Sequence, residues 1–203
     1  MILNKTLSFF SYLFHPVFIP LFGTVFFLFC IENYYEMFDK VLIIIQIILL
    51  TVLIPVTFLY LLKIIGKVDS ILISNVSQRK IPFLIQIFLM IMLLTKSIPI
   101  DRIPELFYFF LGGLISTILA FGLLFLKVKA SIHMIGISSL TLFIIGLSLQ
   151  NHANWVFLIA VLILSNGIVA SSRLQSAAHS CKELGIGFFL GAIPHLFLWK
   201  YWL

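Results

Sequence analysis

The sequence of 203 residues has few charges: 10% of its residues are charged and 62% are hydrophobic, against about 25% and about 45–50% in soluble domains. This scarcity excludes an ordinary soluble protein, because long stretches carry no charge at all. The charge-free stretches are 6–31, 41–62, 81–95, 106–126, 130–172 and 184–199. A helix crosses the hydrocarbon layer with about 20 apolar residues, so the stretch 130–172 is long enough for two. The sequence predicts an all-α, polytopic bundle of six or seven transmembrane helices that forms one domain over 1–203.

Cysteine is equally scarce, and neither of the two present indicates a metal or redox site. Cys30 and Cys181 lie far apart in the sequence and form no Cys-x-x-Cys pair, the spacing typical of zinc and dithiol sites. The other metal-binding side chains show no ligand spacing either. We therefore expect a protein that works without a metal ion and without a cofactor.

The net charge of +6 points to an anionic partner. The basic residues are scattered through the short polar links between the hydrophobic stretches and form no long basic run. That distribution favours an anionic membrane surface, or a lipid that carries a phosphate, over a nucleic acid. We therefore expect contact with membrane lipids and no nucleic-acid partner.

The polar links set the expected helices. The cluster 150–154 consists of turn-favouring residues, so it divides the stretch 130–172 into a hairpin of two helices. We expect helices over 7–31, 41–62, 82–95 and 104–126, two within 130–172, and one over 180–202. His15 precedes Pro16 in the first of these and predicts a kink; the alternative is that it lines a site. Asn166 is expected to form hydrogen bonds within the bundle.

Helices that alternate in direction place the polar links at two ends of the bundle. The amino terminus and the links 63–80, 127–133 and 172–182 share one end, which we call the basic end. Its basic residues are Lys5, Lys63, Lys67, Arg79, Lys80, Lys127, Lys129, Arg173 and Lys182. The opposite end carries Lys40, Lys96, Arg102 and Lys200. The positive-inside rule favours a basic end that faces the cytoplasm, but an outward-facing basic end stays open as the alternative.

The strongest local signal is a histidine followed four residues later by an acid, His179 and Glu183. On a helix these positions stack on one face about 6 Å apart along the axis, so Glu183 is placed to accept a hydrogen bond from one imidazole nitrogen. The other nitrogen then faces outward as a nucleophile or base. Further steps of four reach Gly187 and Gly191, which let a second helix approach closely. The alternative is a histidine at the membrane edge, a snorkelling acid and an ordinary packing face.

A second signal is the pattern Lys-x-Ser-x-His at the expected start of a helix, with Lys129, Ser131 and His133. The first backbone N–H groups of a helix and its positive dipole end point at the same space, an arrangement that suits a phosphate. His133 is then placed to donate a proton to a leaving oxygen. The alternative is that Ser131 caps the helix and His133 is an interfacial residue.

A third signal is a pair of cations, Arg79 and Lys80, before another helix start. An arginine binds two phosphoryl oxygens at once, and a lysine adds a point charge. The alternative is that both residues only set the topology, since basic residues flank most membrane helices.

The three signals together resemble the type 2 phosphatidic acid phosphatase and vanadium haloperoxidase superfamily, and more closely a small multi-helix branch in Bacteroidetes-type bacteria. That superfamily carries a Lys/Arg-Pro motif, a Pro-Ser-Gly-His motif and a Ser-Arg-x5-His-x3-Asp motif. The third motif matches, with glutamate for aspartate, at Ser172, Arg173, His179 and Glu183. The second corresponds to residues 130–133 and the first, loosely, to Arg79 and Pro82. The resemblance covers residues 79–191.

This resemblance implies a phosphatase of a lipid phosphate or a polyprenyl diphosphate, with a phosphatidic acid phosphatase-like core, in a bacterial cytoplasmic (inner) membrane. His179 would attack phosphorus to form a phosphohistidine, Glu183 would orient it, and His133 would protonate the departing alkoxide. The phosphate-binding residues would be Arg173, Arg79, Ser131, Lys80, Lys129 and Ser172. Such groups stabilise the charge that develops on phosphoryl oxygens. The mechanism of the superfamily needs no metal ion.

Two other functions stay open on the sequence. Ala130 and Ile132 replace the proline and glycine of the second motif, and Leu72 replaces the lysine of the first. These departures are compatible with a non-catalytic relative that binds phospholipid headgroups or membrane partners. A small transporter is the other alternative, but it needs polar residues through the middle of the membrane, and the sequence has few there beyond Asn166 and His15.

Overall fold

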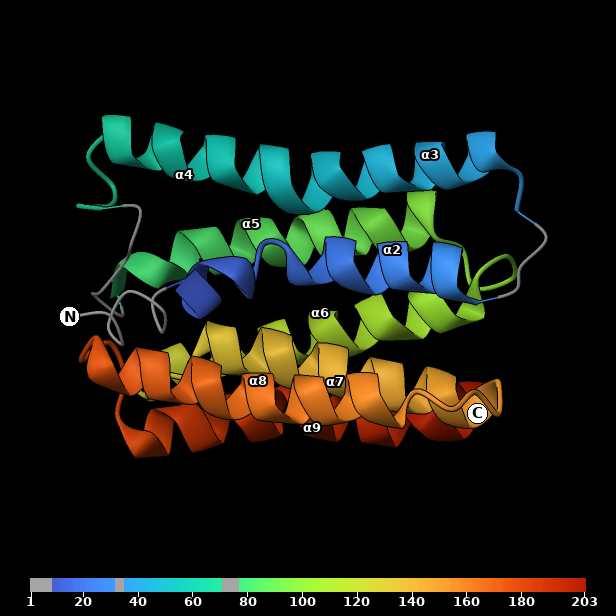
Figure 1. Cartoon of the computed structure of the whole chain (residues 1–203). Coiled ribbons are helices and arrows are strands. Elements are labelled where there is room, and N and C mark those ends of the chain that lie inside the picture. The colour runs from blue at the N-terminus through green and yellow to red at the C-terminus, as the bar shows by residue number, and fades with distance from the viewer. Residues whose placement is uncertain (1–8, 32–34, 71–76) are drawn as a thin grey trace.

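The computed structural model describes residues 9–31, 35–70 and 77–203, and within these ranges all regular structure is helical (Figure 1). The main helices are α2 (Ile19–Cys30), α3 (Met37–Ile47), α4 (Ile54–Ile64), α5 (Lys80–Met92), α6 (Pro104–Phe125), α7 (Ile132–Gln150), α8 (Val156–Gln175) and α9 (Cys181–Trp202). Shorter elements are η1 (Ile48–Leu53), η2 (Ser77–Arg79) and η3 (Leu93–Ser97). Lys5 and Leu72, named above, lie outside the described ranges.

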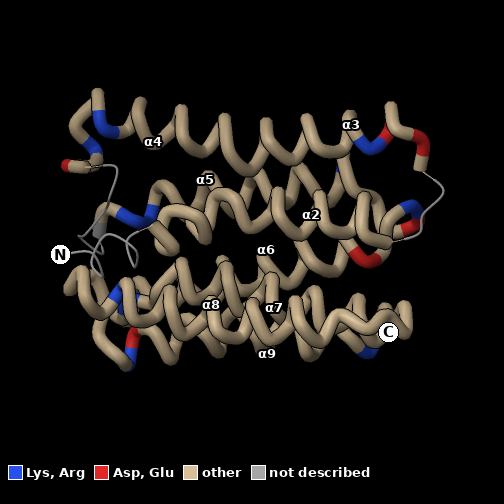
Figure 2. The backbone as a smooth tube through the Cα atoms, in the orientation of Figure 1, with Lys and Arg blue, Asp and Glu red and all other residues tan. Residues whose placement is uncertain are grey.

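Six helical stretches in the described part of the chain are long and apolar enough to cross a membrane. They are Met37–Ile64, Lys80–Ser97, Pro104–Phe125, Ile132–Gln150, Val156–Gln175 and Cys181–Trp202. Consecutive stretches run in opposite directions (Figure 1), and the charged residues gather at the two ends of the bundle with an uncharged zone between them (Figure 2). The prediction of an all-α bundle with at least six helices able to cross a membrane is therefore confirmed, and α7 and α8 form the expected hairpin.

The first segment differs from the single helix expected over 7–31, of which residues 7 and 8 lie outside the described part. Residues 9–13 are helical, the helix breaks at 14–18, and α2 begins only at Ile19. The cause is Pro16, which has no backbone N–H to donate and disfavours helical backbone at His15. With 12 residues, α2 is about 18 Å long. That is shorter than the hydrocarbon layer, which is about 30 Å thick.

The second helix is longer than expected and runs without a break through α3, η1 and α4. Its middle part is a π-helix because Pro55 cannot donate to the carbonyl of Thr51. The N–H of Ile54 donates to the carbonyl of Leu49 instead, and the hydroxyl of Thr51 donates to the carbonyl of Ile47 over 2.8 Å. This helix lies at the outside of the bundle, since only 11% of its most apolar window is buried.

The centre of the bundle is α7, whose most apolar window is 61% buried. It packs closely on α9 because α9 has glycines where the two backbones meet. A Cβ atom at Gly187 would lie 2.5 Å from the carbonyl oxygen of Ser131, and one at Gly191 would lie 2.3 Å from that of Ile135. The close approach predicted from these glycines is confirmed. The expected bond of Asn166 is also present, since its amide donates to Thr141 Oγ1 on α7 over 2.8 Å.

Candidate functional site

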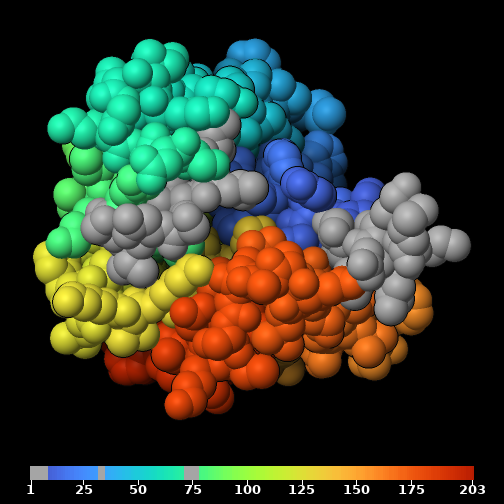
Figure 3. Space-filling view, turned by 90° about the vertical axis from the view of Figure 1, so that its left-hand side faces the viewer, coloured from blue at the N-terminus to red at the C-terminus, as the bar shows by residue number. Residues whose placement is uncertain are grey.

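The basic end brings together segments that are far apart in the sequence. Figure 3 looks onto this end, where the link after α6, in yellow, borders the turn between α8 and α9, in orange. Two hydrogen bonds join these segments. Lys129 Nζ donates to the carbonyl oxygen of Ala178 over 2.7 Å, and the N–H of Ser131 donates to the carbonyl oxygen of Glu183 over 3.2 Å. The second and third sequence motifs are therefore neighbours in space.

His179 and Glu183 form the pair that the sequence predicts, with 2.8 Å between His179 Nδ1 and Glu183 Oε2. The expectation that both lie on one helix is wrong, because Ser180 takes the N-cap position with extended backbone and α9 begins at Cys181. Glu183 reaches back from the first turn of α9 and also accepts from the N–H of Ser180 over 3.2 Å. The Ser180 hydroxyl accepts from the N–H of Glu183, which completes a capping box.

This arrangement fixes the chemistry of the His179 ring. Because Glu183 accepts at Nδ1, a neutral ring carries its proton there and its lone pair on Nε2. Nε2 has no hydrogen-bond partner among the described residues, and the side chain of His179 is only 6% exposed. An imidazole held in this tautomer can act as a nucleophile or as a base through Nε2.

Ser131 stands at the N-cap position of α7, but its hydroxyl makes no capping hydrogen bond. The alternative in which this hydroxyl caps the helix is therefore wrong. The residue is fully buried, and its Oγ has no partner in the described part of the chain. A buried hydroxyl without a partner costs free energy of about 1–3 kcal/mol. The position thus offers a donor that a ligand oxygen would satisfy.

Arg173 lies in the last turn of α8 and turns inward. Its Nη1 donates to the hydroxyl of Ser11 over 3.1 Å, while its buried Nε has no partner within the described ranges. Ser172, next to it, is buried as well. His133, in the first turn of α7, contacts His15, with ring centroids 5.1 Å apart and ring planes at 86°. Ser11 was not assigned to a site from the sequence, whereas for His15 a place in a site was the alternative to a kink.

The charges at the basic end act on one another. Burial lowers the pKa of Arg79, with Glu183 opposing and Arg173 adding to that shift. Burial lowers the pKa of Lys129, and the charge of Arg79 lowers it further. The pKa of His179 lies below its ordinary value of 6.5 because the ring is buried and because Lys129 and Arg79 repel another positive charge, whereas Glu183 acts in the opposite direction. His179 is therefore neutral at pH 7, and the charge of Glu183 acts on two neighbouring cations, Arg79 and Lys129.

Lys80 is the exception among the predicted site residues. Its Nζ lies over the ring of Phe125, 4.8 Å from the ring centroid, and its side chain is exposed. Successive residues of a helix point about 100° apart, so Lys80 leaves the direction of Arg79 and forms a cation–π contact at the membrane edge. The structure therefore does not bring Lys80 together with the other predicted phosphate-binding residues.

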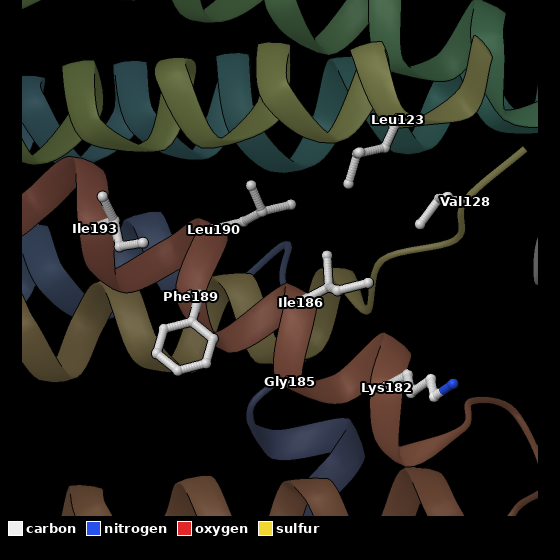
Figure 4. Close-up of a pocket in the computed structure, with 8 residues that line it drawn as sticks. All are labelled: Leu123, Val128, Lys182, Gly185, Ile186, Phe189, Leu190 and Ile193. Atoms are coloured by element: carbon white, nitrogen blue, oxygen red, sulfur yellow. The ribbon is translucent and has the colours of Figure 1, made fainter. Parts of the chain in front are cut away.

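A shallow groove lies next to the cluster, between α6 and α9 (Figure 4). It is lined by Leu123, Val128, Lys182, Gly185, Ile186, Phe189, Leu190 and Ile193. All of these are apolar except Lys182, which stands with Val128 at one end. Those two residues directly neighbour Glu183 and Lys129 in the sequence, so the groove starts at the edge of the cluster.

Comparisons with protein-family models, curated protein sequences and solved structures give no match to this chain. Among the described residues there is also no group of three or more His, Cys, Asp and Glu side chains placed to hold a metal ion. The function is therefore inferred from the chemistry of the basic end.

Proposed function

We propose that the protein is a membrane lipid-phosphate phosphatase, which hydrolyses a phosphomonoester or diphosphate of a lipid or polyprenol through a phosphohistidine on His179. The proposal places it with the type 2 phosphatidic acid phosphatases in a bacterial cytoplasmic membrane.

The observation that supports this function best is an excess of buried donors and positive charge. Glu183 raises the pKa of Arg79 and of Lys129, whereas the charge of Arg173 lowers the pKa of both. Two buried donor atoms, Ser131 Oγ and Arg173 Nε, have no partner in the described chain. Like charges that are partly withdrawn from water repel strongly. A phosphate dianion offsets this repulsion and accepts the unpaired hydrogen bonds.

The first chemical step follows from the tautomer of His179. The lone pair of Nε2 attacks phosphorus, a P–N bond forms, and the bond between phosphorus and the lipid oxygen breaks. Glu183 holds the Nδ1 proton and stabilises the positive charge that the ring gains. The cations and the Ser131 hydroxyl stabilise the charge on the non-bridging oxygens.

The departing oxygen needs a proton, and His133 is the donor in this proposal. It lies in the first turn of α7, and its ring contacts His15, on the same segment as Ser11, which binds the proposed phosphate ligand Arg173. In the second step neutral His133 takes a proton from water while the water oxygen attacks the phosphohistidine. The P–N bond breaks, inorganic phosphate leaves, and both histidines return to their starting states.

The groove between α6 and α9 supplies the place for the lipid chain. Its lining is apolar apart from Lys182 (Figure 4), which directly precedes Glu183 in the sequence. A substrate bound with its phosphate at His179 and its chain along Ile186 and Phe189 keeps its charge out of the hydrocarbon layer and its apolar chain out of water.

The test uses the full chain purified in detergent and two probes, dioleoyl phosphatidic acid and farnesyl diphosphate. Phosphate release that orthovanadate inhibits supports the proposal, and labelling with [³²P]phosphatidic acid should yield an acid-labile, base-stable phosphoprotein. His179→Ala should form none of it, and His133→Ala should form it slowly. Vanadate binding without phosphate release from either probe would contradict catalysis and support a protein that only binds phospholipid headgroups.

A further inference from the structure

The interrupted first segment, residues 9–18, lies against the residues of the proposed site. The break that Pro16 causes frees His15 from regular helical geometry. The N–H of Val17 then donates to His15 Nδ1 over 3.4 Å, so the ring is held by its own backbone. A histidine fixed in this way has a defined direction, and His15 contacts the ring of His133.

Two contacts from this segment reach two different site residues. The rings of His15 and His133 meet edge to face with 5.1 Å between their centroids, an arrangement that aromatic rings prefer. One helical turn before His15, the buried Ser11 hydroxyl accepts from Arg173 Nη1 over 3.1 Å. The segment therefore contacts both α7 and α8.

The α7 helix has a small residue where the segment approaches. A Cβ atom at Gly136 would lie 3.0 Å from Ile19 Cγ1 and 3.7 Å from Pro16 Cα. Gly136 lies one turn after His133, so the close approach of the Pro16 backbone puts His15 at the level of the His133 ring. The contact between the two histidines thus follows from the packing of the backbone.

We infer that His15 is a positioning residue of the site, which holds the ring of His133 edge to face in the orientation that proton transfer to the leaving oxygen requires. This role rests on the proposed function. The interruption of the first helix permits this contact, because an unbroken helix would keep residues 9–18 in regular geometry and the His15 ring away from His133. His15 itself does not touch the reacting phosphate.

The test distinguishes the contact of the His15 ring with His133 from hydrogen bonding by His15 and from a general loss of stability. We compare His15→Ala, which removes the ring, with His15→Phe, which keeps an aromatic edge against His133, and with His152→Ala at the opposite end. His15→Ala should lower kcat about tenfold to a hundredfold, since a misplacement of the order of 1 Å costs about 10²-fold. KM should stay within about threefold because the phosphate ligands are intact, and His15→Phe should recover most of kcat.

A second readout does not depend on catalysis. In protein labelled with [¹⁵N]histidine, the imidazole resonances of His133 should shift or broaden in His15→Ala and stay near their native positions in His15→Phe and His152→Ala. Unchanged His133 resonances in His15→Ala, or an unchanged kcat, would overturn the positioning role. If the native protein releases no phosphate, the proposed function fails, while the resonances still decide whether His15 orients His133.

Discussion

The two ends of the bundle use the same residue types in opposite ways. At the end opposite the site, Lys40 Nζ lies 5.4 Å from the centroid of Phe29, and Lys200 Nζ lies 4.3 Å from that of Phe197. At the basic end, Lys129 instead turns inward to the carbonyl of Ala178, and Arg173 is partly buried with an unpaired Nε.

This difference distinguishes membrane anchors from candidate ligands. A cation over an exposed aromatic ring keeps its charge in water and its carbon chain at the membrane edge, which is how basic residues flank transmembrane helices. A buried cation beside other cations has no such explanation. The inward set at the basic end therefore supports the proposed anion site, whereas Lys80 lies over Phe125 in the way that Lys40 and Lys200 lie over their rings.

The largest expected effect is the loss of activity in His179→Ala. Both ends have a histidine in a link between helices, and His152 at the opposite end is the matched control. Removal of the nucleophile should lower phosphate release from phosphatidic acid by on the order of 10⁴-fold or more, whereas His152→Ala should stay within about twofold of native because it lies away from any site. Equal losses in both variants would show that the two ends do not differ in function.

The next effect separates the two roles of Glu183. Glu183→Gln keeps the capping box, because glutamine at this position also reaches back to the N-cap N–H, but it removes the charge that stabilises the His179 imidazolium. Activity should fall about 10³-fold with little change in melting temperature. Ser180→Ala should do the reverse, with about 1 kcal/mol lost from stability and most activity kept. If Glu183→Gln stays active, Glu183 is only a helix cap.

Helices and links were largely predictable from the sequence because hydrophobic length and turn-forming residues act locally. The hairpin around 150–154 and the glycine contact at Gly187 are examples. The split of the first segment at His15 was underestimated, since a kinked continuous helix and two short helices have the same hydrophobic length. Only the packing of Pro16 against Gly136 shows which one forms.

The residues of the candidate site could be predicted from the sequence, but the directions of their side chains could not. The spacing of His179 and Glu183 indicated a pair, and the pair forms, but through a capping box that depends on where α9 begins. Arg79 and Lys80 look alike in the sequence. Arg79 lies near Glu183, whereas Lys80 lies over Phe125. The rotation of about 100° between successive helical residues sends the two side chains in these different directions.

A smaller effect compares glycines at the two ends. A Cβ at Gly187 would meet the backbone of Ser131 at 2.5 Å, and one at Gly146 would meet the Trp202 ring at 2.7 Å. Both alanine variants should lose about 1–3 kcal/mol of stability through overpacking. Only Gly187→Ala should also lower activity of the remaining folded protein, because it displaces Ser131. Thermal unfolding in detergent, with activity per folded molecule, checks both. Equal specific activities would argue that Ser131 is not a ligand.

The smallest effect is a shift of the pH profile. The pKa of His179 lies below 6.5, partly because of the charges of Lys129 and Arg79, so kcat/KM should fall on the acid side as His179 takes up a proton. Lys129→Met removes a positive charge, favours the protonated ring, and should move this acid limb to higher pH. Lys63→Met, exposed at the same end, and Lys40→Met, at the opposite end, should leave it in place. Because all variants act on one substrate, its own ionisation cancels. A shift in all three would assign the effect to net charge, and a shift in Lys129→Met alone to the neighbourhood of His179.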